Sequence, residues 1–249
     1  MRVRVVVSPN FDRRQDPANI RLVVLHYTGM PDAASALRRL CDPASRVSAH
    51  YLIDEDGTIY SLVPEPLRAW HAGVSAWREW NDPNSVSIGI ELVNPGHDFG
   101  YRPFPAAQID ALCALLERIR ARHPIAPRDI VGHSDIAPAR KRDPGELFPW
   151  VRLAARGLAI WPTDAAAVRP VDPLRAAHLL RCVGYRRDLP DTGFADCIRA
   201  FQRRFRPERV DGVLDGRTMA LLEGAAGLSQ EGGLPIFPVG TGGRMAAPA

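Results

Sequence analysis

The sequence predicts an α/β fold in which helices flank a central mixed β-sheet, followed by a small three-helix domain. Two kinds of segment predict the first part. Residues 20–26 (IRLVVLH) and 87–93 (SIGIELV) are short apolar runs rich in β-branched side chains, as in buried strands. Residues 105–122 carry apolar side chains at helical spacing and predict a long amphipathic helix. Strands and helices in this order are typical of a sheet covered by helices.

The other elements of the first part follow along the chain. A helix that opens at Pro31 is expected over residues 31–40. Residues 49–63 (AHYLIDEDGTIYSLV) predict two strands around a Glu-Asp-Gly turn. Residues 128–133 (RDIVGH) predict a short strand that ends in a histidine. We expect these elements to form one domain over residues 1–160.

A linker and three short helices are predicted next. Residues 161–171 are rich in proline and alanine, as linkers are. A minimal three-helix module is expected over residues 172–226, with helices in 172–185, 193–205 and 215–226. Residues 227–249 have loop composition and are expected to form a Gly/Pro-rich tail.

Three arginines, Arg203, Arg204 and Arg206, form the only dense basic cluster of the sequence. They fall on one amphipathic segment, so we expect a solvated helix face rather than a contact with nucleic acid. The formal charge of +4 is compatible with acidic ligands but is not specific for them.

Composition limits the class of protein. With 249 residues, 46% of them hydrophobic and 24% charged, the chain can bury one full core and a second small one. The apolar run at the N-terminus is too short for a secretory signal or a membrane span. We therefore expect a monomer without membrane insertion in the cytoplasm, or in the periplasm if an export signal is missing from this sequence. The cysteines show no CxxC spacing and are expected to be buried free thiols.

Three residues form a candidate metal site. Hydrolytic zinc needs three protein ligands and leaves one position open for water. His26 and His133 each close an apolar strand, so rigid backbone would hold both rings. Asp143 lies in an Asp-Pro-Gly turn and could supply the third ligand. Spacing alone does not establish that the three residues meet in space.

Two further residues could carry out hydrolysis at such a site. Glu91 lies among apolar neighbours, which should desolvate its carboxylate and raise its pKa toward that of a general base. Lys141 is the single lysine beside 31 arginines, which suggests a position that requires a compact ammonium. That ammonium could stabilise the oxyanion formed when an amide carbonyl is attacked.

Each of these residues also has a simpler interpretation. A histidine at a strand end is often a structural hydrogen-bonding residue, and aspartate before Pro-Gly is often a turn former. Glu91 could pair with an arginine, and Lys141 could reflect codon bias. The hypothesis of a metal hydrolase rests on their coincidence.

The chain resembles the zinc-dependent N-acetylmuramoyl-L-alanine amidases of the type 2 family, whose fold is shared with peptidoglycan recognition proteins. The similar segments are VVLHYTG, SAHYLIDEDGTIYSLVPE, RAWHAGVSAW, NSVSIGIELVNPG and VGHSDIAPARKRDPGELFPW, in the family's order. The resemblance implies that His26, His133 and Asp143 bind Zn²⁺, that Glu91 is the catalytic carboxylate and that Lys141 stabilises the transition state. Ala49 and Asp143, where other branches have tyrosine and cysteine, place the chain with the glutamate-using amidases.

The resemblance also implies a substrate and a groove. The reaction would be hydrolysis of the amide between N-acetylmuramic acid and L-alanine of the stem peptide. His71, with Trp70, Trp77 and Asn94, is similar to the family's substrate groove, although either tryptophan could equally belong to the core. Residues 172–226 resemble a peptidoglycan-binding domain, which could instead merely pack on the first domain.

Three functions remain open from the sequence. The chain could be an amidase for soluble muropeptides in cell-wall recycling, or the same enzyme acting on intact periplasmic peptidoglycan. It could also be a recognition protein that only binds. The complete set of His26, His133, Asp143 and Glu91 argues against the third, because binding alone does not require a base.

Overall fold

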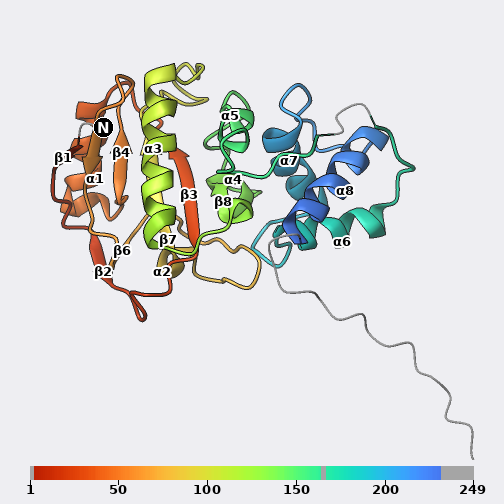
Figure 1. The fold of residues 1–249 in the computed structure, drawn as a ribbon, viewed down its shortest axis with the longest axis horizontal. Helices are drawn as coiled ribbons and strands as arrows, with labels where there is room; N and C mark the ends of the chain where they lie inside the picture. Colours follow the sequence, from red (N-terminus) through yellow and green to blue (C-terminus); the bar gives the residue numbers. More distant parts are fainter. Residues whose placement is uncertain (1–2, 164–166, 231–249) are drawn as a thin grey trace, which may run out of the picture.

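A six-stranded mixed sheet forms the centre of the N-terminal part of the chain in a computed structural model that describes residues 3–163 and 167–230. The strand order is β1-β5-β4-β7-β3-β8 (Figure 1). The central strands β4, β7, β3 and β8 run parallel, and β5 is antiparallel to β4. Their bounds are Val3–Val5 (β1), Leu22–Tyr27 (β3), Tyr51–Ile53 (β4), Ile59–Ser61 (β5), Ser87–Leu92 (β7) and Ile130–Gly132 (β8). A separate antiparallel pair joins β2 (Phe11–Arg13) to β6 (Leu67–Ala69).

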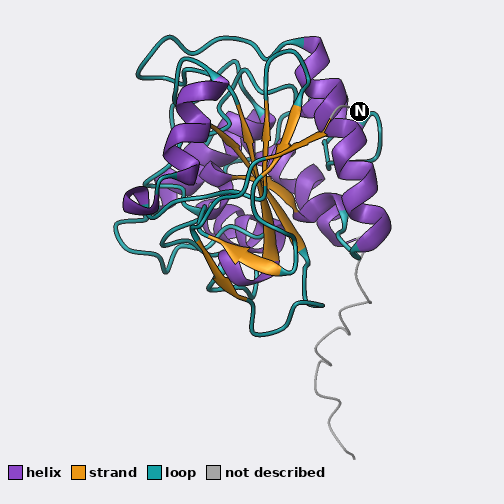
Figure 2. Cartoon of the chain, turned by 90° about the vertical axis from the view of Figure 1, so that its left-hand side faces the viewer, coloured by secondary structure: helices purple, strands orange, loops and turns teal. Residues whose placement is uncertain are grey.

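Helix α3 (Ala106–Arg122) covers one face of the sheet, and its buried side chains form the main core with that face (Figures 1 and 2). Because side chains alternate along a strand, Val23 and Leu25 of β3 point into this core. Their neighbours Leu22, Val24 and His26 therefore face the other way. The remaining helices of this domain are α1 (Ala33–Cys41), α2 (Pro83–Val86), α4 (His133–Ile136) and α5 (Trp150–Ala154), with 3₁₀ turns at Pro43–Ser45 and Pro127–Asp129.

Three helices follow the linker and pack beside β8 and α4 (Figure 1). They are α6 (Pro173–Val183), α7 (Phe194–Phe205) and α8 (Gly216–Gln230). One apolar cluster contains Leu22 and Val24 of β3 together with Leu180 and Phe201 of these helices. The three-helix part therefore completes the core on the second face of the sheet.

The predicted fold class is confirmed, and most predicted elements are present within a residue or two. The turn at 54–57 joins β4 and β5 as expected, with Gly57 at positive φ. Strands β1, β2 and β6 are not among the elements predicted from the sequence, since they are short and largely unburied and therefore lack the apolar run that marks a core strand. Helix α8 ends at Gln230, beyond the predicted limit at 226, and the tail from residue 231 lies outside the described residues.

The expected solvated face at Arg203, Arg204 and Arg206 is wrong. These side chains are 7%, 2% and 7% exposed. Arg204 pairs with the buried Asp135 of the first domain at 2.9 Å, and Arg206 pairs with Asp215 inside the three-helix part. Arg203 lies 3.8 Å from a carboxylate oxygen of Glu146. Each arginine thus has a carboxylate partner from another segment of the chain, and sequence pattern alone does not reveal such partners.

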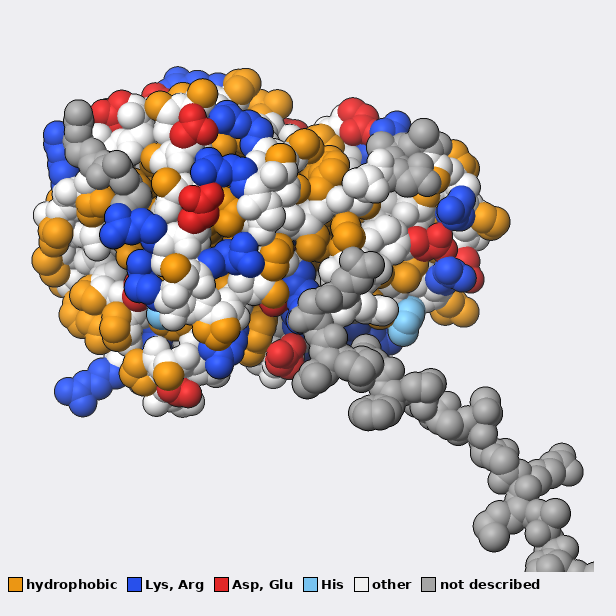
Figure 3. Space-filling view, viewed as in Figure 1, with side chains coloured by type: hydrophobic (Ala, Val, Ile, Leu, Met, Phe, Trp, Pro, Cys, Tyr) orange, Lys and Arg blue, Asp and Glu red, His pale blue; other side chains and the backbone are white. Residues whose placement is uncertain are grey.

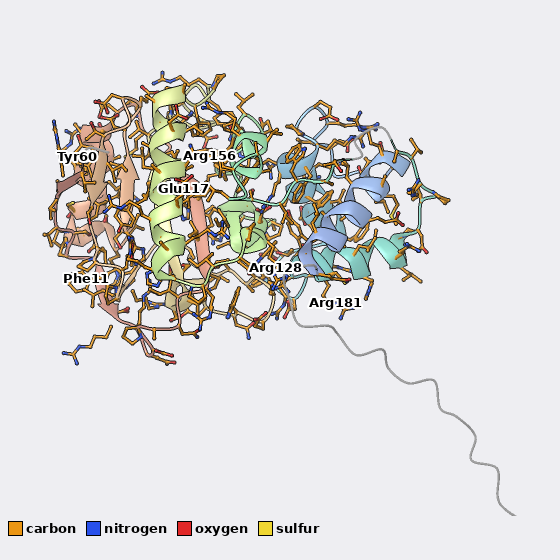
Figure 4. All side chains as sticks on the ribbon, viewed as in Figure 1. Phe11, Tyr60, Glu117, Arg128, Arg156 and Arg181 are labelled. Atoms are coloured by element: carbon orange, nitrogen blue, oxygen red, sulfur yellow. The ribbon has the colours of Figure 1, made fainter. Side chains whose placement is uncertain are left out.

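The outer face of α3 is charged with both signs mixed (Figure 3). Arg152 pairs with Asp110 at 2.8 Å, and Arg156 pairs with Glu117 at the same distance; the second pair is labelled in Figure 4. Within the described residues all four cysteines are free thiols, two of them buried, and no helix is long and apolar enough to cross a membrane.

Candidate metal centre and active site

Three buried side chains converge at the carboxyl ends of the central parallel strands. His26 lies in β3, His133 is the first residue after β8, and Asp143 lies in the loop that follows α4. The Nδ1 atoms of the two histidines are 2.9 Å apart, and Asp143 Oδ2 lies 3.0 Å from each of them. The sequence-predicted ligand set is therefore brought together, although its members are up to 117 positions apart along the chain.

The donor set fits a zinc ion. Tetrahedral zinc with bonds of about 2.0–2.1 Å keeps its ligand atoms about 3.3 Å apart, within a few tenths of an ångström of the distances here. His133 Nε2 lies 3.0 Å from the carbonyl oxygen of Ala72, so this nitrogen donates and Nδ1 keeps a free lone pair. Two ring nitrogens and a carboxylate oxygen thus present lone pairs to one point, an arrangement that a cation stabilises.

The electrostatics keep these groups in the form that binds a cation. Burial, together with the neighbouring His133, lowers the pKa of His26 to about 4. Burial would raise the pKa of Asp143, but the imidazoles of His133 and His26 hold it well below its usual range. At neutral pH the site therefore combines a neutral His26 imidazole with a carboxylate.

Glu91 lies directly beside His26, because parallel register pairs the two residues across β7 and β3. Both side chains therefore project from the same face of the sheet. Among the described residues Glu91 Oε2 is shut from solvent without a hydrogen-bond partner. Burial and the nearby Asp143 raise the pKa of Glu91 well above its ordinary value, and Lys141 acts in the opposite direction. A carboxylate of raised pKa with one buried, unpaired oxygen is suited to accept a proton.

A cavity of about 410 Å³ opens above these groups. Its lining includes all three candidate ligands together with Glu91, Lys141, Trp70 and His71. Cationic side chains also reach the lining, namely Arg39, Arg140 and Arg142. One of them, Arg142, pairs with Asp98 of the same lining at 2.7 Å. The cavity thus joins a candidate metal centre to a wall that carries cationic side chains.

His71 lines this cavity, and it also supports His26. Its Nδ1 atom lies 3.1 Å from His26 Nε2, and its Nε2 atom lies 3.1 Å from Ser87 Oγ. With His26 Nδ1 turned to the metal position, His26 Nε2 donates to His71, which donates in turn to Ser87. Gly89 makes room for this ring, since a Cβ there would lie 2.4 Å from His71 Cγ.

Two of the residues expected in the substrate groove are buried elsewhere. Trp77 is completely buried against Tyr185, with ring centroids 5.2 Å apart, in the core that the sheet shares with the three-helix part. Asn94 is also completely buried, and its side chain bonds the backbone of Arg102 and Gly96. Neither side chain is accessible to a ligand, so the structure does not support the predicted groove role of either residue.

Sequence analysis missed a polar chain at the edge of the cavity. The Tyr27 hydroxyl lies 2.9 Å from His97 Nδ1, and His97 Nε2 lies 3.1 Å from Glu146. The His97 ring also stacks on Tyr101 at 4.3 Å. In the sequence, only the position of Tyr27 next to His26 could have indicated these hydrogen bonds. His97 and Glu146 are 49 residues apart, so no local pattern connects them.

Comparison with known proteins decides the family. The family description N-acetylmuramoyl-L-alanine amidase (Amidase_2) matches residues 16–146, which is more than half of the chain and contains all of the candidate ligands and Glu91. The chain belongs to this amidase family. The predicted enzyme class, an N-acetylmuramoyl-L-alanine amidase, is thereby confirmed.

Individual members of the amidase family are similar over much of the chain. N-acetylmuramoyl-L-alanine amidase AmiD of Escherichia coli is 41% identical over 238 residues, which cover 85% of each protein. The 1,6-anhydro-N-acetylmuramyl-L-alanine amidase AmpD of Haemophilus influenzae is 38% identical over 60% of this chain and 89% of its own. The solved complex of Escherichia coli AmiD with anhydro-N-acetylmuramic acid-L-Ala-D-γ-Glu-L-Lys superposes with a TM-score of 0.75 at 40% identity, covering 86% of this chain and 92% of that one.

Proposed function

We propose that this amidase uses Zn²⁺, held by His26, His133 and Asp143, to hydrolyse the amide between N-acetylmuramic acid and L-alanine of the stem peptide. Sugars in the 1,6-anhydro form are included, as peptidoglycan recycling requires. The observation that carries the proposal is the triangle of three ligand atoms with edges of 2.9–3.0 Å, with Glu91 on the adjacent strand. A site that only bound its ligand would not require a carboxylate with a buried, unpaired oxygen at this position.

The roles of the residues follow from their chemistry. Bound zinc supplies Lewis acidity and lowers the pKa of water toward 7. Glu91 takes a proton from the attacking water and passes it to the amine of L-alanine as the C–N bond breaks. The Lys141 ammonium lines the same cavity and stabilises the negative charge that develops on the carbonyl oxygen. His71 and the Ala72 carbonyl hold the ligand rings in orientation.

The cavity wall supports an anionic muropeptide as the substrate. The ligand in the solved AmiD complex carries a γ-linked glutamate, whose α-carboxylate stays free, and a C-terminal carboxylate. Arg39, Arg140 and Arg142 line the cavity here and match such charges. Trp70 also lines it and offers an aromatic face to a sugar ring.

A Glu91→Gln variant tests the mechanism. Glutamine preserves the shape of the side chain but accepts no proton, so we expect kcat to fall by about 10²- to 10⁴-fold. Zinc content, measured by elemental analysis, should stay at the parent level because Glu91 is not a ligand. The matched control is Glu117→Gln, which alters a carboxylate on the outer face of α3. Near-parent activity of Glu91→Gln would exclude this mechanism, and full activity after exhaustive chelation would exclude the metal.

Two comparisons test the substrate and the location. Initial rates on anhydro-muropeptides should exceed those on intact sacculi, whereas the reverse order would favour wall degradation. The cytoplasmic location stays a prediction that fractionation of cells expressing the untagged protein tests. Glycan binding by residues 172–226 likewise stays a prediction, for which co-sedimentation with sacculi is the assay.

A further inference from the structure

Asp135 of α4 is the point at which the two parts of the chain are tied together. Its side chain is 1% exposed and accepts three hydrogen bonds. One comes from the backbone N–H of Gly132 at 2.8 Å, within the first domain. The other two come from the three-helix part, from Arg204 Nη1 at 2.9 Å and from the Tyr185 hydroxyl at 2.6 Å.

Arg204 is itself held firmly at this junction. Its Nη2 atom donates to the carbonyl oxygen of Ile130 in β8 at 3.1 Å. Its guanidinium lies 4.1 Å from the ring centroid of Trp150 and 4.8 Å from that of Phe205. The junction continues beyond this point, since Arg128, labelled in Figure 4, donates to the carbonyl oxygen of Ser229 in α8 at 2.9 Å. The three-helix part therefore forms hydrogen bonds with both β8 and α4.

Helix α4 holds several residues of the candidate active site in place. It begins with the candidate ligand His133, and the carbonyl oxygen of Ala137 at its end accepts from the backbone N–H of Lys141 at 3.0 Å. The N–H of Ser134 donates to the carbonyl oxygen of Asp143 at 2.9 Å. Gly132 is packed closely against Pro144, since a Cβ there would lie 2.7 Å from Pro144 Cδ. A shift of this one turn would displace two candidate ligands and Lys141 together.

We infer that Arg204 and Tyr185 are positioning residues for the metal centre, acting on His133 and Asp143 through Asp135. The three-helix part is then a component of the catalytic unit, whether or not it also binds glycan. This inference rests on the proposed metal site. The inference rests on two buried donors of the three-helix part, Arg204 and Tyr185, which bond the helical turn that begins at His133. Groups that orient metal ligands in this way tune the affinity for the metal.

The test measures zinc affinity by competition with a chelator, at a temperature far below the unfolding transition of each variant. Tyr185→Phe removes one donor but keeps the buried ring, and we expect zinc to dissociate several-fold more readily. Arg204→Met removes the charged partner of Asp135, and we expect a loss of about 10- to 100-fold. The matched control is Arg206→Met, because Arg206 is also buried but pairs with Asp215 and Thr218 inside the three-helix part.

The outcomes separate this inference from the proposed function. Weaker zinc binding in Tyr185→Phe and Arg204→Met, with parent affinity in Arg206→Met, supports the inference. Parent affinity in all three variants overturns it, as does an equal loss in Arg206→Met, which would indicate general destabilisation. A His133→Ala variant tests the metal site itself: if it binds zinc as tightly as the parent, the proposed function fails and the inference falls with it.

Discussion

A single methyl group at position 89 should weaken the metal site from a distance. A Cβ added to Gly89 would lie 2.4 Å from His71 Cγ, whereas ordinary contacts of such atoms begin near 3.4 Å. The His71 ring must therefore retreat by about 1 Å. Its hydrogen bond to His26 Nε2 is already 3.1 Å long, so the displacement breaks it. The backbone of Gly89 is not in the left-handed region, so the effect comes from this contact rather than from strain.

The magnitude follows from the role of His71 behind a metal ligand. Loss of such a partner typically costs 10- to 100-fold in metal affinity, or about 1.4–2.7 kcal/mol. Chelator competition on Gly89→Ala measures this directly. Gly227→Ala serves as control, since an added Cβ there meets nothing within 4 Å among the described residues.

A double variant identifies the cause. His71→Ala alone should weaken zinc binding because it removes the partner of His26. Adding Gly89→Ala to His71→Ala should then cause no further loss of zinc affinity, since the imidazole ring that would clash is absent. If Gly89→Ala lowers zinc affinity equally in both backgrounds, or leaves the parent affinity unchanged, the reasoning from the His71 contact is refuted.

Three further predictions concern catalysis, stability and pH. Lys141→Arg should lower kcat by about 10²- to 10³-fold although the charge is kept, and parent-like kinetics would show that the single lysine has no special role. Trp77→Ala should cost about 3–5 kcal/mol in the free energy of unfolding, measured with urea, because it empties a fully buried site; a surface-like loss under 1 kcal/mol would contradict its place in the core. Burial and the adjacent Arg14 lower the pKa of His50 from 6.5 to about 3. As pH falls, the unfolded state therefore binds a proton before the folded state does. The free energy of unfolding decreases as pH drops from about 6.5 toward 3. A His50→Gln variant should lose less stability than the parent over this window, and equal losses would exclude His50 as the cause.

The sequence was sufficient to predict the central strands, the long helix and a candidate set of metal ligands. Buried strands such as β3 are recognisable because an apolar, β-branched run has few other stable uses. The carboxyl ends of neighbouring parallel strands meet at one edge, so histidines at the ends of two such strands are natural candidates for one site. The Asp-Pro-Gly turn offered Asp143 as a third candidate ligand, and the resemblance of whole segments to the type 2 amidases then implied a role for each residue.

The tertiary structure alone decided which side chains are buried and what they contact. Trp77 and Trp70 both follow small residues in one segment, yet Trp77 is in the core and Trp70 lines the cavity. The difference depends on Tyr185, which lies over a hundred positions later and covers Trp77.

Dependence on distant partners also explains why the contacts of Arg204 and His71 were not predicted. The sequence by itself predicted an α/β amidase, a candidate ligand set with a candidate base, and an appended set of three helices. Only the folded chain shows that Arg204 pairs with Asp135 and that His71 accepts a hydrogen bond from His26. Local pattern reports the periodicity of one segment, whereas burial and hydrogen bonding depend on partners brought from distant segments.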